Sequence, residues 1–276
     1  MEFRTIVDIP SLPFRIQPLQ PLLFVGSCFA DGIGRRFADQ QFPVTVNPYG
    51  VMYNPVSIMH TVQRWLTETD AEGEDAMPRV VFLTLGTNHV YRLKSTGEIV
   101  DNCQKRPQNL FQEEELTVGE CFEVLRQTVA LLVERIPDVQ VVVTVSPIRY
   151  RKYGYHGSQL SKSTLLLAAD RLQQTCPCVS YFPAYEIISD ELRDYRFYAT
   201  DMLHPSEQAA DYIWERLAEA CLSDAARQFI HEYAPIRQAL AHKPFNPDAA
   251  EYQSFRQQNL DRLDALLQHY RAHSGK

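Results

Sequence analysis

The stretch LLFVGSCFADGIGRRF, from Leu22 to Phe37, constrains the fold of this chain more than any other. Leu22 to Val25 is a short, fully apolar run, which is typical of a buried parallel strand. Gly26 ends this run, and apolar residues then recur every four positions, as they do on one face of a helix. Ligands of open α/β sheets bind beyond the carboxyl ends of the strands, so Ser27 in this turn is either a reactive group or a plain helix N-cap.

The rest of the chain repeats this alternation of strand and helix. Apolar, β-branched runs predict further strands at 44–46, 80–85, 140–145 and 179–182. Helical periodicity is clearest at 117–136 and returns near 158–174. Strands that alternate with helices predict an α/β protein with three layers, α/β/α, around a mostly parallel sheet of about five strands.

Several segments lie outside this alternation. Residues 1–21 carry four prolines and predict an irregular arm on the surface, and residues 67–79 predict an exposed polar connection. A turn at 95–98 predicts a β-hairpin, and Pro205 favours the first position of a helix. The last ~50 residues have helical periodicity. We therefore expect an α/β domain at 1–222 and a helical C-terminal extension at 223–276 packed on it.

Composition excludes several classes of function. The chain has 276 residues, 45% of them hydrophobic, and a formal net charge of -7, without any run of Lys and Arg. Nucleic acid is therefore not an expected partner. No apolar run approaches the ~20 residues of a membrane span, and the N-terminus lacks a signal-peptide pattern, so we expect a cytoplasmic protein with no membrane partner. Its oligomeric state is not predicted.

The six cysteines lie at 28, 103, 121, 176, 178 and 221, with no metal-type pair of CxxC motifs. Without an export signal they predict reduced, partly buried thiols rather than a disulfide framework. We expect no metal and no cofactor.

Serine, histidine and aspartate stand where nucleophilic acyl transfer needs them. Ser27 follows the first strand, and Asp201 lies three residues before His204. A serine hydroxyl attacks only when a base takes its proton, and an acid fixes the base. The sequence thus predicts Ser27 as nucleophile, His204 as base and Asp201 as its orienting acid. Cys28 is the rival nucleophile, because thiols are intrinsically better attacking groups.

A developing oxyanion needs hydrogen-bond donors. The candidates are the backbone N–H groups of Ser27 and Gly50 and the side-chain amide of Asn88. Four further residues are candidates for binding substrate: Asn47, His89, Arg149 and His156. Tyr150, Tyr153 and Tyr155 could line a carbohydrate-binding wall or could simply pack.

These residues resemble the GSCFA family, named for a pentapeptide that stands here at 26–30, and grouped with the SGNH or GDSL-like hydrolases. The superfamily blocks occur in order, as Gly26-Ser27, Asn47-Pro48-Tyr49-Gly50, Gly86-Thr87-Asn88 and Asp201-Met202-Leu203-His204-Pro205. Gly-Ser-Cys replaces the usual Gly-Asp-Ser turn, and His89 replaces the Asp after the third block.

The resemblance implies a flavodoxin-like sheet and ester hydrolysis. We expect a serine esterase that acts on a small O-acyl ester, such as an acetyl ester of a carbohydrate or metabolite. Two alternatives stay open: an O-acyltransferase that uses the same triad, and a catalytically silent binding module.

Overall fold

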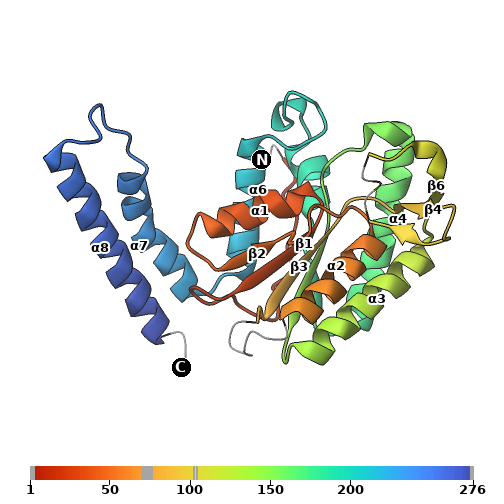
Figure 1. Ribbon diagram of the computed structural model, residues 1–276, viewed down its shortest axis with the longest axis horizontal. Coiled ribbons are helices and arrows are strands. Elements are labelled where there is room, and N and C mark those ends of the chain that lie inside the picture. The colour runs from red at the N-terminus through yellow and green to blue at the C-terminus, as the bar shows by residue number, and fades with distance from the viewer. Residues whose placement is uncertain (1–3, 70–76, 102, 104, 274–276) are drawn as a thin grey trace.

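The computed structural model describes residues 4–69, 77–101, 103 and 105–273 (Figure 1). Its main sheet has five parallel strands in the order β2-β1-β3-β7-β8. The strands are β1 (Leu22–Gly26), β2 (Val44–Val46), β3 (Val80–Leu85), β7 (Gln140–Val145) and β8 (Val179–Tyr181). This order is that of flavodoxin-like sheets, so the predicted α/β/α architecture is confirmed. The order reverses between β1 and β3, which directs a site to the carboxyl ends of these two strands.

Each central strand supplies side chains to two separate cores. In β1, Leu23 and Val25 pack into one core, while Leu22 and Phe24 pack into the other. The Phe24 ring stacks on Phe82 of β3, with centroids 4.4 Å apart. Because both faces of the sheet are covered, these strands are apolar throughout rather than alternating.

Helices cover both faces of the sheet (Figure 1). The helices α2 (Pro55–Glu68), α3 (Val118–Arg135) and α4 (Gly154–Thr175) bury one face. The helices α1 (Cys28–Ala38) and α6 (Glu207–Cys221) bury the other, together with a short helical segment at 184–192. None of the helices in the described ranges is long and apolar enough to cross a membrane.

A second, antiparallel sheet stands beside the main one, in the order β5-β4-β6. It consists of β4 (His89–Leu93), β5 (Ile99–Val100) and β6 (Phe111–Glu115). The predicted hairpin is confirmed in β4 and β5. The strand β6 was not predicted, because its sequence FQEEE has one buried apolar residue and no alternation.

The chain ends in two antiparallel helices, α7 (Asp224–Leu240) and α8 (Ala250–His273), to one side of the sheet (Figure 1). Phe229 of α7 is fully buried and meets the Tyr270 ring of α8 at 5.0 Å. The helical periodicity predicted for this part of the chain is confirmed by α7 and α8, but Phe255 of α8 is 40% exposed.

The sequence predicted an N-terminal arm that lies on the surface, but part of this arm is buried. Leu12 and Ile16 are buried, and the Ile16 N–H donates to the Cys221 carbonyl. Prolines prevent regular structure in the arm but do not prevent its burial, which the end of α6 provides. Residues 70–76 of the predicted polar connection lie outside the described residues.

Candidate active site

The turn between β1 and α1 is held against β3. Gly26 has a φ of 141°, a conformation that side chains rarely allow. The Ser27 N–H that follows donates to both oxygens of Thr84 in β3, at 3.0 Å to the carbonyl and 2.9 Å to Oγ1. The first residues of α1 are therefore fixed at the carboxyl edge of the sheet.

The Ser27 side chain caps this helix. It is fully buried, and its Oγ accepts from the Phe29 N–H at 3.3 Å and lies 3.1 Å from Thr84 Oγ1. The hydroxyl is thus directed at the sheet, and no hydrogen bond joins it to His204 among the described residues.

Cys28, the next residue, faces the histidine. Its partly buried Sγ lies 3.5 Å from His204 Nε2. On the other side of the ring, His204 Nδ1 lies 2.6 Å from Asp201 Oδ2. The structure therefore brings Cys28, His204 and Asp201 together in a row, which differs from the predicted triad in its first member. The sequence contained an indication of this difference. In Gly26-Ser27-Cys28, which replaces the usual Gly-Asp-Ser, the cysteine occupies the third position, where the usual turn has its serine.

Asp201 holds the segment that carries the histidine. Its Oδ1 accepts from the backbone N–H groups of His204, at 3.0 Å, and Leu203, at 2.9 Å. These backbone bonds and the bond from the His204 ring lower the pKa of Asp201 to about 2. The Asp201 carboxylate can only accept a hydrogen bond, so His204 Nδ1 carries the proton that it donates. In the neutral ring Nε2 is then unprotonated, and its lone pair faces Cys28.

The predicted position of Pro205 as the first residue of a helix is wrong. Helix α6 begins at Glu207, and Ser206 is its N-cap. Pro205 instead bridges to Tyr198, and the His204 carbonyl accepts from the Ala199 N–H at 2.8 Å. The His204 ring is therefore carried by an irregular loop that precedes the helix.

The pKa of the Cys28 thiol is raised overall, although its surroundings act on it in opposite directions. Burial raises its pKa, and the negative charge of Asp31 adds to this. The N–H groups of Cys28 and Phe29 and the cation of Lys162 lower the pKa. Helix N–H groups favour a thiolate because the first turn of a helix has unpaired donors.

The three predicted oxyanion donors are already engaged. The Ser27 N–H bonds to Thr84, the Gly50 N–H donates to the Asn47 carbonyl at 2.8 Å, and Asn88 Nδ2 donates to the Leu116 carbonyl at 2.8 Å. By contrast, no hydrogen bond to another residue is found for the Cys28 N–H in the part of the chain described. It lies at the first position of α1.

Asn47 supports the turn rather than facing a substrate. Its buried amide accepts from the Gly26 N–H at 2.8 Å and donates to Asp31 Oδ1 at 2.7 Å. It thereby links β2, the turn between β1 and α1, and α1 itself.

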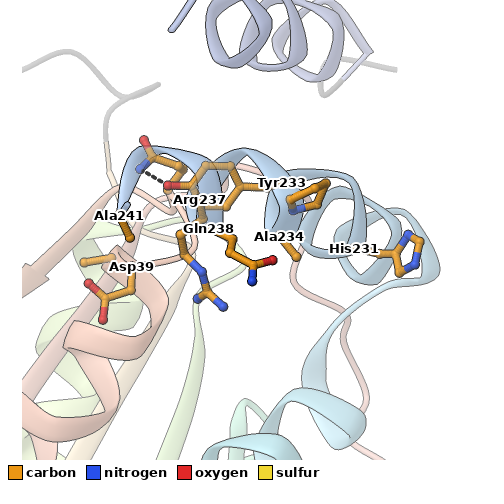
Figure 2. A pocket seen from close by; sticks show the side chains of 10 residues that line it. Asp39, His231, Tyr233, Ala234, Arg237, Gln238 and Ala241 are labelled. Atoms are coloured by element: carbon orange, nitrogen blue, oxygen red, sulfur yellow. Dashed lines mark hydrogen bonds between the residues drawn. The ribbon is translucent and has the colours of Figure 1, made fainter. Parts of the chain in front are cut away.

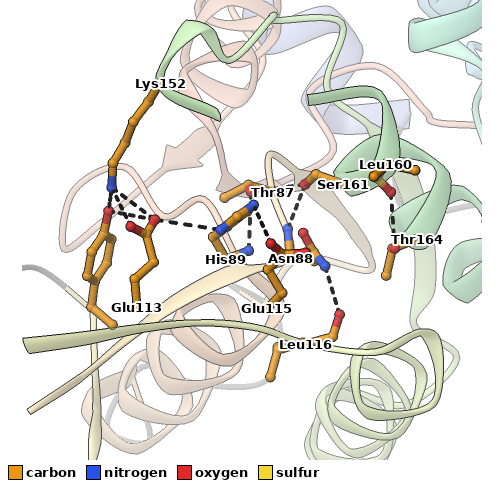
Figure 3. A network of polar contacts seen from close by, with 11 residues as sticks. Thr87, Asn88, His89, Glu113, Glu115, Leu116, Lys152, Leu160, Ser161 and Thr164 are labelled. Carbon is orange, nitrogen blue, oxygen red and sulfur yellow. Dashed lines mark hydrogen bonds and ion pairs between the residues drawn. The ribbon is translucent and has the colours of Figure 1, made fainter. Parts of the chain in front are cut away.

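His89 belongs to a separate polar network (Figure 3). It is buried, its ring stacks on Tyr153 at 3.6 Å, and its Nδ1 lies 3.6 Å from Glu113 Oε1. Burial lowers its pKa. The neighbouring Asn88 has a buried Oδ1 for which the described residues offer no hydrogen-bond partner, and its N–H donates to Ser161 Oγ. These contacts join the small sheet to α4.

Arg149 contacts the loop that carries His204, whereas His156 is not part of the row formed by Cys28, His204 and Asp201. The Arg149 N–H donates to the Leu203 carbonyl at 3.1 Å, and its Nη1 donates to the Met202 carbonyl at 3.2 Å. Its guanidinium lies 4.3 Å from the centroid of the Tyr155 ring. His156 is exposed in the first turns of α4.

A cavity of about 950 Å³ lies far from this chemistry (Figure 2). Asp39, just after the C-terminal end of α1, lines it, together with His231 and Arg237 of α7. Cys28 stands at the opposite end of α1, so this cavity does not serve the triad. Among the described residues, no cluster of His, Cys, Asp and Glu could hold a metal ion.

Fold and site together define a flavodoxin-like α/β protein with a cysteine–histidine–aspartate row at the switch point of its sheet. The chain matches the GSCFA family over residues 21–79 and 76–217, and the C-terminal domain of GSCFA domain proteins over residues 233–273. It belongs to the GSCFA family. No curated protein sequence matches it.

Solved structures with a similar fold are distant in sequence. A member of the lipolytic G-D-S-L family from Veillonella parvula is 15% identical, with a TM-score of 0.45, over 72% of this chain and 97% of its own. A GDSL-like lipase from Bacteroides thetaiotaomicron is 13% identical, with a TM-score of 0.44, over 74% and 90%. A family two carbohydrate esterase from Clostridium thermocellum, solved with cellohexaose, is 12% identical, with a TM-score of 0.45, over 74% and 64%.

Proposed function

We propose that the protein is an esterase that uses a cysteine nucleophile, with Cys28 attacking, His204 as base and Asp201 orienting the base. The observation that carries this proposal is the 3.5 Å contact between Cys28 Sγ and His204 Nε2. The 2.6 Å contact between His204 Nδ1 and Asp201 supports it. Ser27 then serves as the N-cap that fixes the first turn of α1.

The geometry supports a two-step reaction. His204 Nε2 takes the proton of the Cys28 thiol while Sγ forms a bond to the ester carbonyl carbon, and the carbonyl oxygen becomes an oxyanion. When this intermediate collapses, the ester C–O bond breaks, the proton passes from His204 to the departing alcohol, and a thioester remains on Cys28. Water then attacks the thioester with His204 again taking a proton. The acid leaves, and the thiol is restored.

The Cys28 N–H is the oxyanion donor that the structure favours. It lies next to the reacting sulfur at the start of α1, where the helix dipole also favours negative charge. Because Asn88 Nδ2 is held by Leu116, we do not propose Asn88 for this role.

Small acyl groups on a carbohydrate are the proposed substrates. The site is open, since the side chains of His204 and Asp201 are 47% and 44% exposed. Tyr155 and Tyr195 flank Arg149 beside the histidine loop and are 51% and 69% exposed. Aromatic faces with a guanidinium between them suit the apolar faces and hydroxyl groups of a sugar.

The proposal is tested with p-nitrophenyl acetate. Wild-type protein should release nitrophenol and carry an acetyl group that neutral hydroxylamine removes, because a thioester is more labile to this reagent than an oxygen ester. Cys28→Ala should lose both signals. Ser27→Ala, the matched control at the adjacent position, should keep both, because its hydroxyl is directed at Thr84.

Each other outcome identifies an alternative. A hydroxylamine-resistant acetyl group that Ser27→Ala removes and Cys28→Ala retains would restore the predicted serine mechanism. Absence of both nitrophenol release and an acetyl group on wild-type protein would indicate a silent binding module. If added sugar is acetylated faster than acetate is released, the protein is an acyltransferase.

A further inference from the structure

Arg149, in the loop after β7, is a half-buried cation with one edge of its guanidinium group unused. Its Nη1 donates to the Met202 carbonyl at 3.2 Å, and its backbone N–H donates to the Leu203 carbonyl at 3.1 Å. Across the described ranges, no hydrogen bond from its Nε or Nη2 is found. These two nitrogens form one edge of the planar group, and this edge matches the two oxygens of a carboxylate.

The charge of Arg149 has no counterion among the residues that the structure describes. Two acids lie on the segment that leads to His204, and both have other partners. Asp194 pairs with Arg196 at 2.9 Å, and Asp201 lies 2.6 Å from His204 Nδ1. A guanidinium group is always charged, so Arg149 offers a permanent cation at the surface.

Three tyrosine rings surround this cation. The guanidinium carbon lies 4.3 Å from the ring centroid of Tyr155, 5.4 Å from that of Tyr198 and 6.0 Å from that of Tyr195. Tyr155 belongs to the first turn of α4, and Tyr195 to the short 3₁₀ helix Tyr195–Phe197. Both are more than half exposed. Exposed aromatic side chains that gather at one place, rather than singly, are typical of a binding site.

This group lies beside the reacting residues. Met202 and Leu203, to which Arg149 bonds, directly precede His204 in the chain. His204 Nε2 in turn lies 3.5 Å from Cys28 Sγ. The two bonds from Arg149 therefore tie its side chain to the loop that carries the base, and a substrate at Cys28 can reach both.

We infer that Arg149, Tyr155 and Tyr195 form a subsite for a sugar acid, in which the guanidinium group binds the carboxylate of a hexuronate. The exposed tyrosine rings contact the apolar faces of the sugar ring. This inference rests on the proposed function in placing an acylated sugar at Cys28, and it names the substrate class as an O-acyl ester of a hexuronic acid. A neutral sugar has hydroxyl groups but no charge, so it gains less from this cation.

The test measures binding without turnover. Methyl β-glucuronide and methyl β-glucoside differ only in the group at carbon 6, which is a carboxylate in the first and a hydroxymethyl group in the second. Neither contains an ester. Calorimetric titration should show that the glucuronide binds about tenfold more tightly, because a charged, bidentate pair is stronger than a neutral hydrogen bond. Equal affinities would overturn the inference.

Variants locate the preference. Arg149→Met removes the charge and should abolish the preference for the glucuronide, while the glucoside still binds and shows that the site is intact. Arg149→Lys keeps the charge but loses the planar fork, so it should retain a smaller preference. If Arg149→Met binds neither sugar, Arg149→Lys decides, since an undiminished preference there would refute the bidentate contact. Tyr195→Ala should weaken both sugars equally.

Arg151→Met is the matched control for net charge. Arg151 is an exposed arginine two residues further along the same loop. Its loss should leave the full preference for the glucuronide. A preference that survives in Arg149→Met, or one that disappears in Arg151→Met, would show that Arg149 does not recognise the carboxylate.

A third ligand separates the carboxylate from other anions. Methyl glucoside 6-phosphate has the same ring and a larger anion at carbon 6, and it should bind less tightly than the glucuronide; tighter binding would overturn the assignment to a sugar acid. Because these ligands contain no ester, inactivity toward p-nitrophenyl acetate would not affect the result. If the protein cleaves p-nitrophenyl acetate but shows no preference for the glucuronide, the subsite is refuted and the proposed esterase is not.

Discussion

Replacement of Gly26 by alanine tests the turn on which the whole site depends. Gly26 has a φ of 141°, and a Cβ there would lie 2.2 Å from the Thr84 carbonyl oxygen and 2.6 Å from Thr84 Oγ1. Real Cβ atoms do not approach oxygen so closely. Since the carbonyl belongs to the backbone of β3, the clash can be relieved only if β1 and β3 separate.

The expected cost has two parts. A residue with a side chain in this backbone region loses about 1–3 kcal/mol. Separation of the strands also breaks the bonds from the Ser27 N–H to Thr84, and a buried N–H left without a partner costs about 1–3 kcal/mol. We therefore expect Gly26→Ala to lower the free energy of unfolding by about 2–6 kcal/mol, a large part of the stability of a typical domain.

Urea unfolding followed by circular dichroism measures this loss. Gly97→Ala is the control, because Gly97 has a φ of 74° but no heavy atom lies within 4 Å of its Cβ position. This variant should lose only the conformational part, about 1–2 kcal/mol. If Gly26→Ala loses no more than Gly97→Ala, the close approach of the two strands does not constrain the turn, and the reasoning fails.

Three further predictions concern the site and its helices. Asp201→Asn should lower kcat/KM about 10²–10⁴-fold, because the amide does not fix the ring of His204 in the same tautomer; unchanged kinetics would remove Asp201 from the triad. The pKa of Asp201 is lowered to about 2 in the folded protein, below its unfolded value of ~3.9. Asp201 therefore stabilises the fold in full above its unfolded pKa and loses this effect as the pH falls toward 2. The difference in the free energy of unfolding between wild type and Asp201→Asn should be constant above about pH 4 and should shrink below it. Thr117→Ala removes the capping box with Glu120 at the start of α3 and should cost about 1 kcal/mol in urea unfolding; no change would show that water replaces the cap.

The sequence by itself determined the architecture. The runs LLFV, VVFLTL and QVVVTV can be buried on both faces only in a covered parallel sheet, and their strands lie where the pattern predicted them. The sequence also placed the candidate site, because a topological rule directs ligands to the carboxyl ends of such strands. Asp201 and His204 were predicted as a pair from the sequence, and their side chains lie 2.6 Å apart.

Only the tertiary structure decided which of two adjacent residues meets His204. Ser27 and Cys28 are both suitable nucleophiles in a strand-turn-helix segment, and their side chains differ in direction through the φ of Gly26 and the bond of Ser27 to Thr84, which lies 57 residues away in sequence. That contact turns the serine toward the sheet and leaves the cysteine facing the histidine loop.

The same dependence on long-range contacts explains the other differences from the sequence-based predictions. The amides of Asn88 and Asn47, which the sequence offered as substrate or oxyanion contacts, are held by Leu116, Gly26 and Asp31. The periodicity of apolar residues predicts the secondary structure of a segment. The direction of a side chain at a site depends on partners that only the folded sheet brings together.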